Sequence, residues 1–113
     1  EVNVKLSKDE VLRVTKLAAL FAREVGGSIT CETRKDKKVF SVASVANEFG
    51  ENDSEIEAEV DIDAKVTINS RFLIDALNVL DENKLVIEFS NKLTPVVVKN
   101  EKNQKYTHLH SSD

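Results

Sequence analysis

The chain has 113 residues, of which 41% are hydrophobic and 32% charged, and its formal net charge at pH 7 is −4. This length supports one core, so we expect a single domain over residues 1–113. The composition is typical of a globular protein and excludes a disordered chain. No apolar run is long enough to cross a bilayer and no secretory signal opens the chain, so we predict a cytoplasmic protein with no membrane partner.

The single cysteine, Cys31, cannot form an internal disulfide, which fits a reducing compartment. No nearby His or Asp marks it as a nucleophile, so we interpret it as a small buried residue of a strand. The negative net charge excludes a nucleic-acid-binding protein that relies on overall basicity. It does not exclude a protein whose basic side chains gather on one face.

The first quarter of the chain predicts a strand followed by a helix. Residues 2–6 alternate apolar and polar side chains, and Ser7 and Glu10 have the spacing of a capping box. The helix is expected over residues 8–24, before Gly26 and Gly27. Its predicted core face holds Val11, Val14, Leu17, Ala18, Phe21 and Val25.

Other residues of this helix lie away from the predicted core face. Lys16 and Arg23 point nearly opposite to it, whereas Leu20 lies on the outer side and widens the apolar surface. Such a surface is typical either of a broad core stripe or of a helix that also packs on another domain or subunit.

From Ser28 onward, apolar and polar residues alternate, as in a strand. Residues 28–34 and 39–46 predict a hairpin with a polar turn. After a polar loop, a strand is expected over residues 56–62, whose apolar side chains alternate with four carboxylates: Glu55, Glu57, Glu59 and Asp61. Because like charges along one face repel each other, this face is either a solvated edge or a docking surface for basic residues of a partner.

The second half repeats the order of elements. A short strand at residues 65–68 precedes a helix at 69–80 that starts with the cap residues Asn69 and Ser70. Its apolar residues share one helix face: Phe72, Leu73, Ala76, Leu77 and Leu80. Arg71 lies outside this face. Further strands are predicted over residues 84–89, 94–99 and 105–109, with Pro95 at a strand start or an edge.

The order of strand, helix and three strands therefore occurs twice. The two halves hardly resemble each other in sequence, so the chain repeats a βαβββ pattern rather than a sequence. Two such units predict an α+β fold in which antiparallel sheets join into a continuous layer and both helices lie on one face.

No group of residues predicts catalysis. His108 and His110 could supply two metal ligands on one strand face, but no third ligand accompanies them. We therefore predict no catalytic residues, no metal, no cofactor and no enzymatic activity. Exposed basic side chains such as Lys16, Arg23 and Arg71 are usually plain solvated surface. If both helices line one concave surface, however, these residues become phosphate contacts that do not read sequence.

The order of several segments is similar to that of a known family. The first half contains VNVKLSKDE, LAALFAREVG and NEFGENDSEIEAEV, and the second contains NSRFLIDALNVL, LTPVVVK and KYTHL. Over residues 2–109 these segments resemble the third domain of the bacterial sliding clamp, the beta subunit of DNA polymerase III. The resemblance implies a processivity factor, in which two three-domain chains close head to tail around duplex DNA. DNA polymerase III and clamp-loader subunits would dock on its outside through peptides.

The resemblance also implies three groups of site residues. The DNA-facing group would comprise Lys16, Arg23 and Arg71. The interface of the homodimer would contain Leu20, Phe21, Glu51, Glu55 and Glu57. The third-domain side of the partner-peptide pocket would be lined by Asn69, Phe72, Leu93, Pro95 and Leu109.

The chain departs from the family pattern in the pocket and in its length. The family more often has Tyr at Phe72 and often a small polar residue at Pro95, and its last strand ends in Met-Pro-x-Arg rather than HLHSSD. One domain cannot encircle DNA, so the resemblance predicts a fragment of a longer clamp. Two alternatives remain open. One is a stand-alone acidic domain whose carboxylate face binds a basic partner, and the other is a metalloenzyme that uses His108 and His110.

Overall fold

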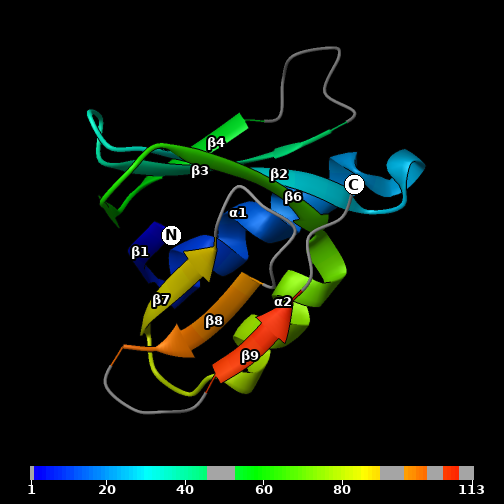
Figure 1. Ribbon diagram of the computed structural model, residues 1–113. Helices are drawn as coiled ribbons and strands as arrows, with labels where there is room; N and C mark the ends of the chain where they lie inside the picture. Colours follow the sequence, from blue (N-terminus) through cyan, green and yellow to red (C-terminus); the bar gives the residue numbers. More distant parts are fainter. Residues whose placement is uncertain (1, 46–52, 90–95, 102–105, 110–113) are drawn as a thin grey trace.

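The computed structural model describes residues 2–45, 53–89, 96–101 and 106–109 (Figure 1). It confirms the predicted α+β class. In chain order the elements are β1 (Val2–Ser7), α1 (Lys8–Phe21), the 3-10 helix η1 (Arg23–Val25), β2 (Ser28–Arg34), β3 (Val39–Ser44), β4 (Asp53–Glu57), β5 (Glu59–Val60), β6 (Ala64–Asn69), α2 (Ser70–Val79), β7 (Lys84–Phe89), β8 (Val96–Asn100) and β9 (Tyr106–Leu109).

The repeated pattern is a structural repeat. β1 and β6 start 62 residues apart, and each strand runs directly into a helix through an N-cap residue, Ser7 or Asn69. The buried side chains of the two strands occupy the same positions in this register: Val4 and Leu6 in β1, Val66 and Ile68 in β6. The two units therefore use one design with different residues.

The strands form two sheets rather than one continuous layer, which corrects that expectation. Their orders are β5-β1-β7-β8-β9 and β4-β3-β2-β6. Each unit thus gives its first strand to the sheet of the other unit: Val4 of β1 pairs with Ile87 of β7, and Val66 of β6 pairs with Cys31 of β2. The described ladders are all antiparallel, so each sheet can bury one face and leave the other in solvent.

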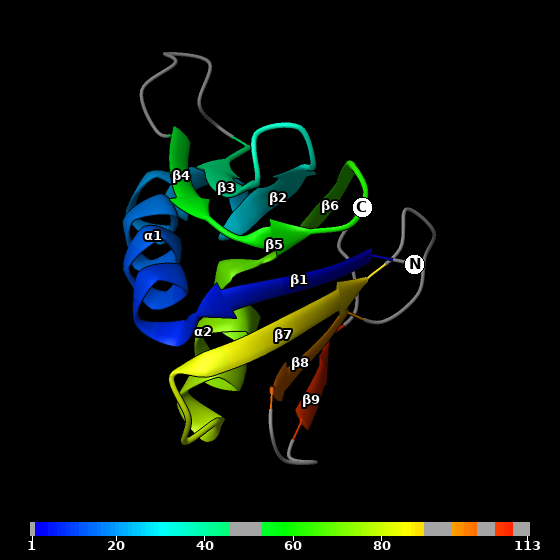
Figure 2. The same ribbon diagram turned by 90° about the vertical axis from the view of Figure 1, so that its left-hand side faces the viewer.

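The two helices pack against each other on one side of the strands, as predicted (Figure 2). α1 contacts β3 and β4, whereas α2 contacts β6 and β9. The buried side chains of both helices and of the inner faces of both sheets form one apolar core. Cys31 belongs to this core, as expected, and burial raises the pKa of its thiol to about 12.

The predicted core face of the first helix is only partly correct. The helix predicted over residues 8–24 is α1 followed by η1, and Leu17, Phe21 and Val25 are exposed rather than buried. The buried stripe consists of Val11, Val14, Thr15, Ala18 and Ala22. Most of these side chains are small, which allows α1 to lie close to α2 and the sheets, and the larger residues remain on its flank.

The predicted capping box is also wrong. Ser7 is the N-cap residue of α1, but its side chain accepts no hydrogen bond from the helix. Asn83, in the loop after α2, caps the helix instead: its backbone carbonyl accepts from Lys8 N (2.6 Å) and its Oδ1 from Asp9 N (3.1 Å). The Ser7 hydroxyl donates to the same Oδ1 at 3.4 Å. The start of α1 is therefore capped by a residue distant in sequence, Asn83, and not by the predicted capping box.

The ends of the two helices are tied to each other. Lys8 Nζ, at the start of α1, donates to the carbonyl of Leu80, the C-cap residue of α2 (2.7 Å). At the opposite end, Ser70 N, at the start of α2, donates to the carbonyl of Gly27, in the turn after η1 (2.8 Å). Each helix therefore begins beside the end of the other, and the pair is antiparallel.

The strand predicted over residues 56–62 is divided at Ala58. β4 pairs with β3, whereas β5 pairs with β1 in the other sheet. Glu55 and Glu57 consequently lie in one sheet and Glu59 in the other, and Ile62 is exposed rather than buried. The continuous carboxylate face, on which the stand-alone alternative depended, is not formed.

The remaining predicted elements agree closely with the structure. The hairpin is β2 and β3, and the strand predicted over residues 65–68 lies within β6. β7 spans residues 84–89, while Pro95 and the starts of the last two predicted strands fall outside the described residues. In α2 the residues Leu73, Ala76, Leu77 and Leu80 are buried as expected, but Phe72 is 56% exposed, which corrects its place on the core face.

The cap provided by Asn83 can be tested by substitution. Asn83→Ala should lower the free energy of unfolding by about 1 kcal/mol, because Asp9 N loses its acceptor. Ser7→Ala is the matched control and should have a clearly smaller effect, since Ser7 caps no amide. Urea unfolding of both variants measures the difference, and equal effects would contradict the assignment.

Candidate functional site

The three predicted DNA-facing residues are all exposed and come from three helical segments. Lys16 lies on α1, Arg23 begins η1, and Arg71 lies in the first turn of α2. Because the end of η1 is held against the start of α2, Arg23 and Arg71 belong to neighbouring segments although they are far apart in sequence. The helical segments of both units therefore carry exposed basic residues.

Asn69 forms the joint between these segments. Its Oδ1 accepts from Arg71 N (2.9 Å), and its Nδ2 donates to the carbonyl of Gly26 (3.0 Å). Gly26 and Gly27 have φ values of 71° and 85°, and residues that carry a side chain rarely adopt such positive values. A Cβ added to Gly27 would lie 3.4 Å from Ser70 Oγ, so the two segments are in close contact. Asn69 thus has a structural role in addition to the predicted place in a pocket.

The flank of α1 carries the apolar residues predicted for the subunit interface. Leu20 is 62% exposed and Phe21 is 51% exposed, and Leu17, one turn earlier, is 41% exposed. Burying one such side chain typically contributes about 1.5–3 kcal/mol, so a cluster of three favours an interaction surface.

The acidic part of the same predicted interface lies close to this helix. α1 contacts β4, an edge strand on which Glu55 and Glu57 are exposed. Glu51 lies outside the described residues. The structure therefore places the helix of Leu20 and Phe21 in contact with the strand of Glu55 and Glu57.

The predicted pocket residues are only partly described. Phe72 lies exposed on α2, and α2 contacts β9, whose residue Leu109 pairs with Val96 of β8. The side chain of Leu109, as well as Leu93 and Pro95, lies outside the described part of the chain. The structure thus places the helix of Asn69 and Phe72 beside the strand of Leu109.

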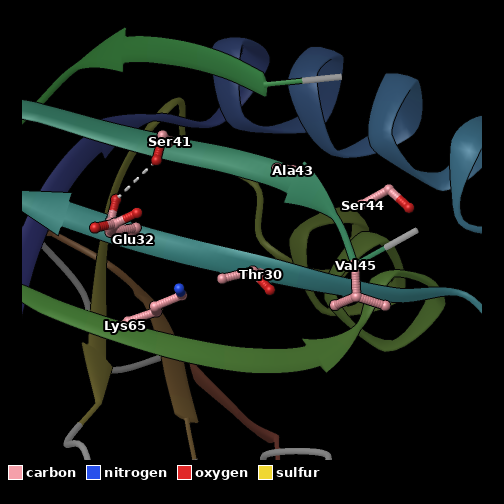
Figure 3. A pocket seen from close by; sticks show the side chains of 7 residues that line it. All are labelled: Thr30, Glu32, Ser41, Ala43, Ser44, Val45 and Lys65. Carbon is pink, nitrogen blue, oxygen red and sulfur yellow. Dashed lines mark hydrogen bonds between the residues drawn. The ribbon is translucent and has the colours of Figure 1, made fainter. Parts of the chain in front are cut away.

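A shallow hollow of about 320 Å³ lies on the outer face of the β4-β3-β2-β6 sheet (Figure 3). Lys65, Glu32 and Ser41 are cross-strand neighbours in it, and the Ser41 hydroxyl donates to the backbone carbonyl of Glu32 (3.5 Å). Its lining contains hydroxyl groups, one carboxylate and one ammonium group, but neither His nor Cys. Glu32, Ser41 and Lys65 thus form a row of polar cross-strand neighbours on this sheet face.

Within the described residues, no group of three or more His, Cys, Asp or Glu side chains could hold a metal ion. The predicted HxH pair is not tested by this, because His110 and the side chain of His108 fall outside the description. None of the described helices is long and apolar enough to span a membrane.

The family model for the DNA polymerase III beta subunit, C-terminal domain, matches residues 1–112. The chain belongs to this family. This confirms the resemblance predicted from the sequence. It also removes the basis for treating the chain as an unrelated acidic interaction domain.

Individual relatives of this chain are distant. The beta sliding clamp of Staphylococcus aureus (strain N315) is 26% identical over 112 residues, covering 96% of this chain and 29% of the relative. The beta sliding clamp of Staphylococcus epidermidis is 24% identical over the same length, again covering 29% of the relative. The chain therefore spans less than a third of the length of these clamps.

Solved clamp structures share the fold at still lower identity. The DNA polymerase III beta subunit of Thermotoga maritima has a TM-score of 0.88 at 18% identity, covering 99% of this chain and 30% of that one. The Bacillus subtilis sliding clamp has a TM-score of 0.88 at 16% identity, covering 100% and 30%. At such identities the likeness shows the fold alone.

Sequence reasoning missed two exposed apolar residues of this chain. Leu17 was predicted to lie in the core, and Val79, which is 51% exposed, was not assigned to any surface. The exposure of Leu17 could have been inferred from the small residues Ala18 and Ala22, because small residues indicate the side of α1 that packs most closely.

The structural role of Asn69 can be measured separately from any role in binding. Asn69→Ala should lower the free energy of unfolding by about 1–2 kcal/mol, because it removes the cap of α2 and the bond to Gly26. Asn69→Asp keeps an acceptor for Arg71 N and should be less destabilising. Asn78→Ala, on the exposed side of α2, is the control. Equal urea midpoints for all three variants would contradict the structural role of Asn69.

Proposed function

We propose that this chain acts as the third domain of a sliding clamp. In this role it is part of a non-catalytic processivity subunit that works in the cytoplasm, encircles duplex DNA without sequence specificity and docks polymerase and clamp-loader peptides. The observation that carries the proposal is the fold of two βαβββ units with paired helices, in a chain that belongs to the beta subunit family. The chain covers 29% of its relatives, so the ring is a property of the longer protein.

The surface of the paired helices suits duplex DNA in the centre of the ring. Lys16, Arg23 and Arg71 are exposed there, while the chain as a whole has a net charge of −4. Long basic side chains bind phosphate groups of any sequence, and acidic surfaces elsewhere limit adhesion of DNA to the outside. A few such contacts per domain hold the DNA loosely enough for the ring to slide.

The exposed end formed by α1 and β4 suits the contact between two clamp subunits. Leu20 and Phe21 supply the apolar area, and Glu55 and Glu57, with Glu51, supply charge at its rim. This division between an apolar centre and a polar rim is typical of stable protein interfaces. The full-length protein is accordingly proposed to be a homodimer closed head to tail.

The partner-peptide pocket is proposed to lie beside the start of α2. Asn69 and Phe72 border it, together with Leu93, Pro95 and Leu109. The exposed ring of Phe72 supports this proposal, because aromatic side chains with solvent access commonly anchor peptide ligands. DNA polymerase III and clamp-loader subunits are the expected ligands.

The subunit contact is tested in the full-length clamp that carries this domain. Leu20→Glu should convert the dimer to a monomer, because an unpaired carboxylate would be buried in the interface. Val45→Glu makes a comparable change at another exposed apolar position, on a different surface, and should leave the dimer intact. Sedimentation velocity distinguishes the two states, and a dimeric Leu20→Glu variant would refute the interface.

The DNA-facing surface predicts a specific salt dependence. Arg23→Ala and Arg71→Ala should weaken binding of the ring to duplex DNA. The logarithm of the association constant decreases linearly with the logarithm of the salt concentration, and this slope should become less steep by about 0.9 for each phosphate group that is no longer neutralised. Lys37→Ala, at the exposed turn between β2 and β3, is the control and should keep the slope. Fluorescence anisotropy at several salt concentrations measures it, and unchanged slopes for both Arg variants would exclude them as DNA-binding residues.

A further inference from the structure

The two helices of the domain can be compared position by position, because their N-caps lie 62 residues apart. In this register the buried residues coincide along both helices: Val11 with Leu73, Val14 with Ala76, Thr15 with Leu77 and Ala18 with Leu80. Opposite this buried stripe, each helix has an exposed row of residues spaced four and three apart, so that their side chains share one helix face. The row comprises Asp9, Arg13 and Lys16 on α1 and Arg71, Asp75 and Asn78 on α2.

The charges of this exposed row are reversed between the two helices. Asp9 of α1 corresponds to Arg71 of α2, and Arg13 corresponds to Asp75. At the third position a basic residue of α1 corresponds to an uncharged residue of α2. The two helices therefore have equivalent buried stripes but opposite charges on the side that points away from the core.

The antiparallel arrangement of the helices sorts these charges by end. Lys16 lies in the second half of α1, Arg23 begins η1, and Arg71 lies at the start of α2, which is held against the turn after η1. These basic residues outnumber the exposed acidic residue Glu24 at this end. At the opposite end, where α1 begins and α2 ends, acidic residues outnumber basic ones: Asp9, Glu10, Asp75, Asp81 and Glu82 against Lys8, Arg13 and Lys84.

The stability of α2 does not explain the presence of Asp75. Among the described residues, its carboxylate has neither a hydrogen-bond partner nor an ion-pair partner. Asp is a weak helix former, and a basic residue four positions before an acidic one, as in Arg71 and Asp75, is the less favourable order for a helical pair. The negative charge of Asp75 is therefore free to act on a ligand of this surface.

We propose that Asp75 keeps the phosphate backbone of DNA away from the second half of α2, so that the domain holds duplex DNA only at the end with Lys16, Arg23 and Arg71. The inference rests on the proposed clamp function and adds to it a residue that opposes binding. Side chains four positions apart on a helix have Cβ atoms about 5–6 Å apart, which is less than the screening length of about 8 Å at physiological salt. The charge of Asp75 therefore also repels a phosphate group bound at Arg71, and this weaker hold favours sliding.

The proposal is tested by equilibrium binding of a fluorescent duplex to the full-length clamp that carries this domain. Asp75→Asn should tighten binding roughly fivefold at low salt, because each of the two subunits of the ring loses one exposed repulsive charge. The gain should shrink as the salt concentration rises, since salt screens the repulsion. Asp36→Asn, at the exposed turn between β2 and β3, removes the same charge from another surface and should leave the affinity unchanged. Equal urea midpoints are expected for the parent and Asp75→Asn, because the carboxylate has no partner in the described fold.

A second variant tests whether DNA passes over this part of α2 once the carboxylate is removed. Asp75→Lys extends the basic row along the helix, so the dependence of the association constant on salt should become steeper by about 0.9 for each phosphate group gained. Asp36→Lys is the matched control and should keep the slope of the parent. An unchanged slope for Asp75→Lys would overturn the proposal, because DNA would then lie too far away for Asp75 to repel it.

The remaining outcomes separate this proposal from the proposed function. If Asp75→Asn binds DNA like the parent while Arg23→Ala and Arg71→Ala weaken binding, the role of Asp75 is wrong but the DNA-facing surface stands. If none of these variants changes the affinity, the DNA-facing surface is wrong as well. Equal tightening by Asp75→Asn and Asp36→Asn would mean that only the net charge of the protein matters, and this result also overturns the proposal.

Discussion

The antiparallel helix pair is the constraint on which the rest of this domain depends, and hydrogen bonds between the two units fix it at both ends. The loop after α2 caps the start of α1 through Asn83, and Lys8 reaches back to the carbonyl of Leu80. At the other end, Asn69 and Ser70 hold the turn that follows η1. Each unit thus satisfies the helix termini of the other, which neither could do alone.

The exchange of first strands between the two units also holds the units together. β1 lies beside β7 and β6 lies beside β2, so neither sheet is complete without a strand from the other unit. Separating the units would break two antiparallel ladders and expose the core that both helices share. The domain is therefore one folding unit, although its chain is a repeat.

Small and large residues are divided between the two sides of α1, and this division links packing to function. Ala18 and Ala22 face the core and allow close approach of the neighbouring elements, while Leu20 and Phe21 remain outside. A helix that buried its largest residues would contribute more to the stability of the isolated domain. It would then have less apolar surface to offer another subunit. The exposure of Leu20 and Phe21 supports the proposed subunit contact.

The sequence by itself determined the class of the fold, the order of its elements and the repeat, because alternation of period two, helical spacing and caps are local properties of the chain. The cap at Asn69 and the burial of Leu73, Ala76 and Leu77 follow from such spacing. The resemblance to the clamp family also needed only the order of motifs. Only the tertiary structure decided which side of α1 is buried, since Leu17 and Phe21 are as apolar as Val11 and Val14 and only close packing against α2 and the sheets separates them. It also decided that Asn83 replaces Ser7 as the cap, and that the strand after residue 53 divides between two sheets, because both depend on segments that are distant in sequence.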